Sequence, residues 1–365
     1  MTDVIPLSDV KKIPASKQYD LFTQFYGDAV ELSNTIELWD SLPLFPVSRM
    51  KQDHLRDDNG RLTPLKKDFL YRPTGRNAQP IKAAVRLQAA SIDLDDGSTK
   101  DFYPSANEEI ILEILRKIFN DQQYGFHNEA KAESWVTFTI SMIRKELKAR
   151  GRTRSHDEIL QSLQILRRCH VEVKLEGTRK AIFSEPILSG ALETTRSDWI
   201  ADPHSRWAVR LPLMLSRAVN QVSYRQFNYG IQMALKSQLA RWLHKRLCHN
   251  YTNASLMTPY HITFESIERD SGMLNHTKAD RNMKTVMAAW AELEAKDVIM
   301  KVPTAVRTAD GKGLKFEIYP TPRFVDEMKA ANGRKTKAEA MSGDVSARRR
   351  IAAKRARDER DGAGQ

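Results

Sequence analysis

The sequence predicts an α+β protein made of two tandem winged helix-turn-helix domains. Three helices followed by a β-hairpin are predicted in residues 81–220, and the same order of elements recurs in residues 221–332. The length of 365 residues suits two domains with tails, because a domain averages about 150 residues. We expect an N-terminal arm with a helix and an extended part in residues 1–80, and a basic flexible tail in residues 333–365.

The composition is that of a soluble protein that binds polyanions. The 58 Lys and Arg residues exceed the 46 Asp and Glu residues, which gives a formal net charge of +12 and favours nucleic acid as the partner over a membrane surface. No run approaches the roughly 18 apolar residues of a membrane-spanning helix, and the first residues do not form a secretory signal. Because Cys169 and Cys248 cannot form a disulfide framework, we expect a reducing, cytoplasmic compartment.

The N-terminal arm is predicted to contain a helix followed by an extended peptide. Apolar residues at helical spacing predict the helix over residues 18–41. Two prolines around an apolar centre predict an extended backbone for residues 42–46, which read Leu-Pro-Leu-Phe-Pro. Residues 51–80 are polar and rich in Gly, Pro and Asn, which predicts a flexible connection.

The first domain is predicted to contain three helices between strands. Ser155 and Glu158 form a Ser-x-x-Glu capping box, which marks the start of the third helix. The predicted elements are strands over residues 81–90, 171–175, 182–183 and 207–213, a turn at 95–98, and helices around 110–118, 138–147 and 159–166.

The second domain repeats this order without recognisable identity between the two copies. Thr277 and Asp280 are predicted to cap its third helix. The predicted elements are helices over residues 231–251, 264–270 and 277–296, a turn at 271–272, and strands over 298–306 and 314–319 joined by a turn at 308–313.

The third helix of the second domain is the predicted recognition helix. Met283, Val286, Trp290 and Leu293 form an apolar stripe that should face the core. Arg can pair with guanine and Asn with adenine in the major groove, although an ordinary solvated helix face would have a similar composition. The predicted DNA-contacting residues away from the stripe or at its borders are Lys278, Arg281, Asn282, Lys284 and Thr285.

Further cations are placed for phosphate contacts. The hairpin of the second domain offers Arg307 and Lys312. The first domain either contacts DNA or serves as a dimerisation module, and its candidate DNA contacts are Arg152, Arg154, Gln161, Gln164, Arg168 and Arg179. The helix over 231–251 carries four more cations that either contact the DNA backbone or form a solvated face, namely Lys236, Arg241, Lys245 and Arg246. The tail carries ten Lys and Arg residues and five acids. This excess of cations fits either a solvated tail or an arm that binds phosphates.

No motif for catalysis or for a cofactor is found. The sequence lacks a phosphate-binding loop, a His-x-His pair and a His-Glu-x-x-His motif. His244 and Cys248 share a helix face, but no second pair completes a zinc site. We therefore expect no enzymatic activity, no metal and no cofactor.

With these residues in view, the chain resembles the plasmid replication initiator proteins, especially those of broad-host-range theta-replicating plasmids. The segments that carry the resemblance are Leu239–Leu243, His261–Ile267, the helix over 277–296 with its hairpin, and the capped helix over 155–169 with the strands that follow. The resemblance implies two fused winged helices that bind directly repeated sites, called iterons, at an origin in a bacterial cytoplasm. It also implies melting of a neighbouring AT-rich segment, recruitment of the host helicase and host initiator, plasmid copy control and a monomer–dimer equilibrium.

A peptide for the bacterial sliding clamp is a further feature of some of these initiators. Their peptide reads Gln-Leu-Ser/Asp-Leu-Phe, and Leu42, Leu44 and Phe45 match its anchors, whereas Ser41 and Pro43 depart from it. A mobile, extended peptide with an aromatic tip could fill a groove on the clamp, but packing within the chain would explain the same residues.

Three other functions remain open on the sequence. A dimeric winged-helix transcription regulator would bind a palindrome, a nicking nuclease or primase would need metal chemistry, and a nucleoid protein would bind DNA without sequence preference.

Overall fold

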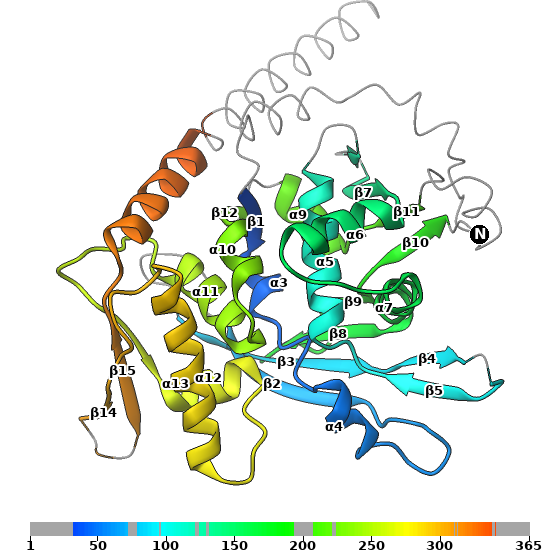
Figure 1. Ribbon diagram of the computed structural model, residues 1–365, viewed down its shortest axis with the longest axis horizontal. Helices are drawn as coiled ribbons and strands as arrows, with labels where there is room; N and C mark the ends of the chain where they lie inside the picture. The colour runs from blue at the N-terminus through cyan, green and yellow to red at the C-terminus, as the bar shows by residue number, and fades with distance from the viewer. Residues whose placement is uncertain are drawn as a thin grey trace, which may run out of the picture.

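The computed structural model is a mixed α/β protein with two hydrophobic cores (Figure 1). It describes residues 32–71, 79–94, 96–120, 124–128, 131–192, 207–220, 224–309, 311, 313–337 and 340. We call the described chain up to residue 220 the first unit and the described chain from residue 224 the second unit. Most of the first core comes from the first unit, and the second core comes from the second unit.

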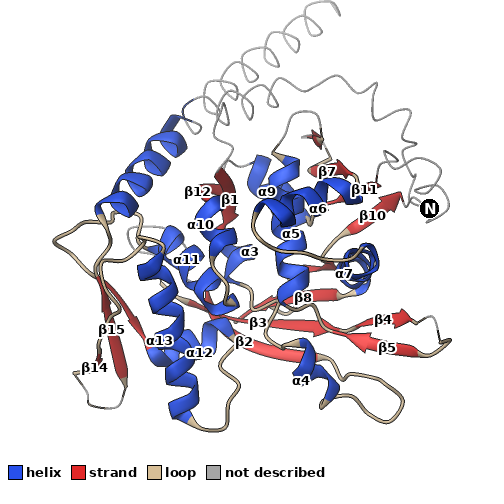
Figure 2. Ribbon diagram, in the orientation of Figure 1, coloured by secondary structure: helices blue, strands red, loops and turns tan. Residues whose placement is uncertain are grey.

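The first unit contains three longer helices and a four-stranded antiparallel sheet. Figure 2 shows α5 and α7 on the same side of this sheet. The helices are α5 (Ala106–Phe119), α6 (Ile140–Ala149) and α7 (His156–Arg168). The strands lie in the order β2 (Leu65–Tyr71), β3 (Ile81–Gln88), β8 (His170–Leu175) and β9 (Phe183–Pro186). Alternation along β3 and β8 buries Val85 and Val173 and exposes Lys82 and Lys174 on the opposite face.

Other strands and short helices complete the first unit. A second sheet has the order β10 (Ser189–Leu192), β11 (Trp207–Arg210), β7 (Glu133–Phe138) and β6 (Gly125–Asn128). The remaining elements are α4 (Arg49–Asp53), the hairpin of β4 (Ala90–Asp93) with β5 (Thr99–Phe102), and α9 (Leu213–Asn220). Since β7 pairs with β6 and β11, it does not join the β8–β9 hairpin that follows α7.

From residue 238 on, the second unit has the order helix, strand, helix, helix and hairpin. Its helices are α10 (Tyr229–Ala234), α11 (Gln238–Asn250), α12 (Phe264–Ser271) and α13 (Ala279–Ala295), and a further helix covers residues 322–337. Its strands lie in the order β13 (Tyr260–Thr263), β15 (Leu314–Ile318) and β14 (Ala305–Arg307). The strand before α12 therefore pairs with the second strand of the hairpin, which closes a three-stranded sheet behind α13.

The start of the described chain joins the two units. Strand β1 (Leu32–Ile36) pairs antiparallel with β12 (Tyr224–Asn228), and the short helix α3 (Glu37–Ser41) follows β1. Trp39 of α3 is buried in the first core. Burial of an aromatic ring and strand pairing hold this segment in the fold.

The prediction for the N-terminal arm is confirmed only in part, since residues 37–41 of the predicted helix form α3 and the chain is non-helical over 42–46. The predicted helix over residues 18–41 lies outside the described residues up to residue 31, and residues 32–36 form a strand instead. Residues 65–71 of the predicted flexible connection form β2, and all of them pair with β3. Phe69 of β2 is buried, but the lysines and the aspartate before it hide the alternation of apolar and polar residues that would predict a strand.

The helices predicted for the second unit are confirmed in order, with four corrections to its elements and to the tail. The long helix over residues 231–251 is broken at residues 235–237 into α10 and α11. The third helix begins at Ala279, so Thr277 and Asp280 do not cap it. The strand predicted over 298–306 is paired as a strand only over 305–307, and the predicted tail is still helical up to residue 337.

Candidate nucleic-acid interface

Helix α13 packs one face into the second core and presents the other to solvent. Val286, Trp290 and Leu293 are fully buried, and the ring of Trp290 lies 6.0 Å from the ring of Phe316 on β15. This confirms the predicted apolar stripe, with Met283 half-buried at its edge. The stripe fixes which side of the helix faces outward.

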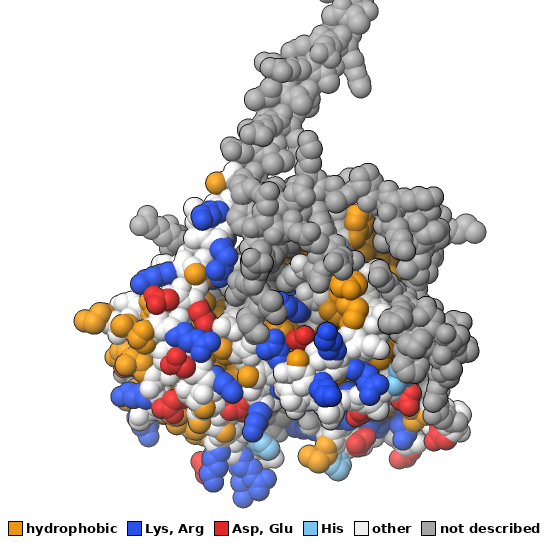
Figure 3. Space-filling view, turned by 45° about the horizontal axis from the view of Figure 1, so that its top comes forward, with side chains coloured by type: hydrophobic (Ala, Val, Ile, Leu, Met, Phe, Trp, Pro, Cys, Tyr) orange, Lys and Arg blue, Asp and Glu red, His pale blue; other side chains and the backbone are white. Residues whose placement is uncertain are grey.

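The outward face of α13 and its start carry three exposed cations, Lys278, Arg281 and Lys284. Thr285 is half-buried, and its hydroxyl donates to the Arg281 carbonyl at 2.9 Å. Farther along, the small residues Ala288 and Ala291 are exposed and would let another molecule approach the helix backbone closely, and Glu294 and Ala295 are exposed in the last turn. The N-terminal end of α13 lies at the lower edge of Figure 1, and Figure 3 shows Lys and Arg side chains projecting at the lower edge of the molecule.

Asn282 is not available for the predicted contact with adenine. Its side chain is 3% exposed, and its Oδ1 accepts the His276 backbone N–H at 3.0 Å. Its amide group donates to the His276 carbonyl at 3.1 Å and to Glu268 at 3.4 Å. These bonds hold the turn between α12 and α13, because His276 lies in that turn. Asn282 therefore shapes the helix-turn-helix instead of reading a base.

The hairpin beside α13 is anchored to α12. Thr308 and Gly313 close its turn with a backbone bond of 2.9 Å, and the Leu314 N–H donates to Glu265 of α12 at 3.3 Å. Arg307 is exposed, with its guanidinium donating to the Gly311 carbonyl at 3.4 Å. Lys312 lies outside the described residues. Arg307 thus lies on a hairpin that is fixed relative to α12.

In the first unit, α7 begins with the predicted capping box of Ser155 and Glu158, which is confirmed. Gln161 and Gln164 are half-buried. Arg168 is exposed, but it donates to the Ser91 carbonyl at 2.7 Å, so this side chain ties α7 to β4. Arg179 is exposed in the turn between β8 and β9.

Two arginines that precede α7 serve the protein interior instead of DNA. The Arg152 guanidinium donates to the Leu235 carbonyl at 2.8 Å, which links the first unit to the break between α10 and α11. Burial lowers the pKa of Arg152. Arg154 donates to Asn107 on α5 at 2.6 Å. Both predictions of a phosphate contact are corrected by these bonds.

The predicted clamp-binding peptide is packed between the units. Leu42 is 5% exposed and Leu44 is 2% exposed, and both belong to the first core. Phe45 is half-buried, and its carbonyl accepts the Gln238 amide of α11 at 3.0 Å. The anchors needed for a clamp groove therefore fill a groove within this chain, which corrects that prediction.

Three of the four cations predicted on the long helix are buried in ion pairs. Arg241 is 1% exposed, and its guanidinium donates to both carboxylate oxygens of Glu109 on α5, at 3.1 and 2.7 Å. Arg246 pairs with the buried Asp270 at 3.0 Å. Only Lys236 of this set is exposed. The predicted backbone contacts of Arg241, Lys245 and Arg246 are thus wrong, because acids from distant segments cover these cations.

Lys245 belongs to a four-residue charge network at the junction of the units. Its ammonium group lies 2.6 Å from Glu113 and 2.9 Å from Asp40, and Arg116 lies 2.8 Å from Asp40. Although burial opposes it, Arg116 and Lys245 hold the pKa of Asp40 well below its usual range. The network joins α3, α5 and α11, so it fixes the second unit relative to the first.

The described residues contain no group of three or more His, Cys, Asp or Glu side chains arranged to hold a metal ion. Burial lowers the pKa of His244 to about 3 and raises the pKa of Cys248 to about 12, so both are neutral groups of the core at neutral pH. No helix in the described part of the chain has the length and apolar character that crossing a bilayer requires.

The sequence matches no family model and no curated protein. Among solved structures, the crystal structure of RctB domains 2–3 is similar to 74% of this chain, at 9% identity and a TM-score of 0.41, over 95% of its own length. A selenomethionine structure of RctB domains 2 and 3 covers 71% of this chain and 92% of its own, at 9% identity and a TM-score of 0.42. The Pi initiator protein in complex with iteron DNA covers 59% and 91%, at 9% identity and a TM-score of 0.39. Similarity at this level assigns no function to the chain, so we base the function on the residues of the interface.

Proposed function

We propose that this protein is a plasmid replication initiator that binds directly repeated origin sequences through two winged-helix units. The observation that carries the proposal is the outward face of α13, where Lys278, Arg281 and Lys284 are exposed while the opposite stripe is buried. A helix of this kind fits the major groove, and the hairpin beside it would contact phosphates or the minor groove. The resemblance of residues 239–243 and 261–267 to initiators supports this function over other kinds of DNA binding.

Arg281 is the residue we assign to base recognition. It is exposed one turn into α13, and a guanidinium can donate two parallel hydrogen bonds to O6 and N7 of guanine. Lys278 and Lys284 are assigned to phosphates, which give affinity and salt dependence without sequence information. Ala288 and Ala291 would allow the duplex to approach the rest of the helix.

The fixed junction supports binding of both units to one duplex. Since Arg241 with Glu109 and the network around Lys245 join α11 to α5, the two units would meet the DNA in a constant register. Each bound copy would then need its sites in one orientation, as in direct repeats. In this proposal α7 and Arg179 supply the contacts of the first unit, and the chain has no catalytic activity of its own.

Origin activity would require further steps. Binding an array of repeats would strain the duplex, and the strain costs least at flexible TA-rich steps, where local melting would begin. The host helicase and host initiator would then be recruited in the bacterial cytoplasm, and a monomer–dimer equilibrium would control copy number. The alternative is a dimeric winged-helix regulator acting on its own operator, for which either unit could supply the dimer interface.

Footprinting on DNA that flanks the gene tests this function. We expect protection of direct repeats, and we expect Arg281→Ala to weaken binding to the repeat by roughly 1–3 kcal/mol and to relax preference at one base pair. Arg217→Ala is the matched control, because Arg217 is exposed on α9, away from α13. Protection of a palindrome would favour the regulator, and unchanged affinity and preference in Arg281→Ala would remove the role of α13.

A further inference from the structure

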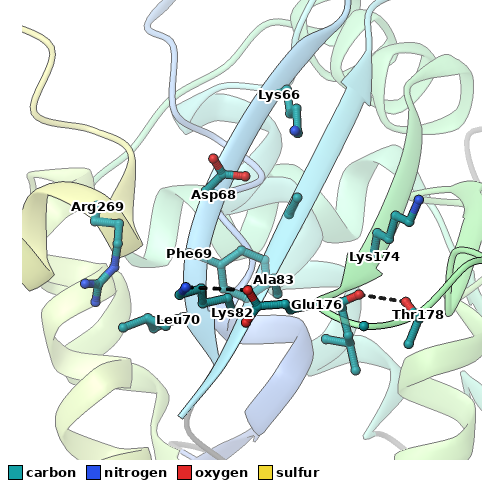
Figure 4. A pocket seen from close by; sticks show the side chains of 13 residues that line it. Lys66, Asp68, Phe69, Leu70, Lys82, Ala83, Lys174, Glu176, Thr178 and Arg269 are labelled. Carbon is teal, nitrogen blue, oxygen red and sulfur yellow. Dashed lines mark hydrogen bonds and ion pairs between the residues drawn. The ribbon is translucent and has the colours of Figure 1, made fainter.

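A groove of about 540 Å³ opens between the two units, on the solvent face of the sheet of the first unit. Strands β2, β3 and β8 form its floor, the turn after β8 borders one side, and Arg269 of α12 borders the other (Figure 4). Helix α12 is also the first helix of the helix-turn-helix, and the turn at residues 272–278 joins it to α13. A duplex that lies on α13 and continues past α12 would reach this groove.

Cations outnumber acids around the groove. Lys66, Lys82, Lys174 and Arg269 surround its floor in Figure 4, and the acids that line it are Asp68 and Glu176. Glu176 pairs with Lys82 at 3.4 Å, in an exposed contact. Lys66 and Lys174 are exposed and have no ion-pair partner within the described chain. Asp68 is exposed and, in the described part of the chain, unpaired as well, so the lining keeps an excess of positive charge that one acid offsets only in part.

Arg269 holds a hydrogen-bond donor without a partner at the edge of the groove. Its Nε donates to the buried carboxylate of Asp270 at 2.7 Å. Asp270 itself is fixed, because it also accepts the Leu70 N–H at 3.0 Å and Arg246 at 3.0 Å. The Nη2 atom of Arg269 is buried and, within the described residues, has no hydrogen-bond acceptor. Although Nη2 itself is covered by the protein, the Arg269 side chain is 37% exposed and lines the groove, so it can place its charge beside a phosphate.

The floor of the groove suits a chain of phosphates better than a small molecule. Ala84 is small and lies on the same face of β3 as Lys82, so the backbone of a ligand can approach this strand closely. The groove is open along the sheet face, whereas small-molecule sites enclose most of their ligand. The described lining contains no exposed aromatic ring on which a base could stack, since Phe69 is 2% exposed.

We infer that this groove binds the sugar–phosphate backbone of the duplex that α13 holds, through Lys66, Lys174 and Arg269. The inference rests on the proposed function and adds a contact that is independent of sequence. Each phosphate bound by a cation releases a counterion, so the groove would raise affinity and steepen the salt dependence of binding without changing base preference.

The test measures binding of the full chain to a random duplex of about 30 base pairs, roughly three helical turns, over a range of NaCl concentrations. Lys66→Gln/Lys174→Gln should lower the slope of log K against log salt by about 1.8 and weaken binding about 30-fold near 0.15 M salt, since each contact contributes about 0.9 to the slope. Lys100→Gln/Lys131→Gln is the matched control, because both lysines are exposed and lie outside the groove. We call Lys66→Gln/Lys174→Gln the groove pair. Adding Arg269→Gln to the groove pair should weaken duplex binding further.

Each outcome decides the inference. A salt slope of Lys66→Gln/Lys174→Gln equal to that of the wild type would overturn the inference. The inference would also fail if this variant lost affinity only for a single strand of the same length and bound the duplex like the wild type. If the groove pair binds normally while Arg281→Ala loses base preference, the groove fails and the proposed function stands. If the wild type binds neither the random duplex nor the flanking DNA, the proposed function fails together with the groove. A loss of affinity with base preference retained in the groove pair supports both.

Discussion

Asn282 provides the sharpest test of how the helix-turn-helix of the second unit is built. The residue occupies the border of α13, where its amide could either read adenine or hold the protein together. The structure places it against the turn, with hydrogen bonds to the backbone of His276 and to Glu268. Replacing Asn282 with alanine removes all of these bonds and leaves a small cavity.

The expected cost follows from the bonds that are lost. The two bonds to the His276 backbone are neutral and contribute about 1 kcal/mol each, and the bond to the charged Glu268 is long, at 3.4 Å, so the three would give about 3 kcal/mol if none were replaced. His276 is an exposed residue, so water can satisfy part of its backbone after the change. We therefore expect Asn282→Ala to lower the free energy of unfolding by about 2 kcal/mol.

Aspartate at the same position adds a pH signature. Asn282→Asp keeps the acceptor for the His276 N–H but places a buried carboxylate beside Glu268, and both burial and the like charge would raise the pKa of the new group. An acid whose pKa is raised in the folded state binds more protons there than in the unfolded state, so lowering the pH stabilises the fold. Relative to Asn282→Ala, this variant should recover stability as the pH falls from about 7 to about 5.

Urea unfolding gives the free energies, and duplex binding by the folded variants gives the function. We expect Asn282→Ala to keep the base preference of the wild type at a temperature where it is fully folded. If the variant has wild-type stability but loses preference at one base pair, Asn282 reads a base and the turn has been misinterpreted.

Two further predictions concern buried charges and buried histidines. Arg241→Met should lower the free energy of unfolding by about 3–5 kcal/mol, because it leaves the Glu109 carboxylate buried without its partner. The double variant Glu109→Leu/Arg241→Met should lower it much less. If urea unfolding shows that the losses of the two single changes simply add in the double variant, the ion pair is contradicted. His244 has a pKa of about 3 in the fold, so the unfolded chain takes up a proton first as the pH falls below about 6.5, and stability at about pH 5 should drop by about 2 kcal/mol from this group. In His244→Gln that part of the drop should be absent, and an unchanged pH profile would show that His244 titrates normally.

Local patterns were sufficient for α12 and α13 of the second unit. The apolar spacing of Val286, Trp290 and Leu293 located α13 to within two residues at its start, and it correctly placed Arg281 on the outside. Gly272, which adopts a φ of +65°, ends α12 where the predicted turn lies. Helical periodicity and a turn glycine are local signals, so they survive without knowledge of the rest of the fold.

Contacts between distant segments account for what the sequence did not reveal. Strand β1 pairs with β12, nearly two hundred positions later, and no local pattern predicts such a partner. Arg241 and Lys245 have the composition of a solvated helix face, yet Glu109 and Glu113 cover them from α5. Asn282 lies at the border of the apolar stripe, so helical periodicity does not predict whether it is exposed or buried. It is buried because the turn before α13 covers it.

The charges at the junction bear on how the two units work together. A buried ion pair stabilises a fold little compared with a well-packed apolar contact, because removing two charges from water costs nearly as much as their attraction returns. What such a contact does supply is a defined geometry, since Arg241 satisfies Glu109 only when both carboxylate oxygens meet the guanidinium, at 3.1 and 2.7 Å. An apolar interface that can slide would let α13 change its distance from the first unit. Binding of two grooves on one duplex requires that this distance stay constant, so a junction built from paired charges fits the role proposed for this protein better than an apolar one would.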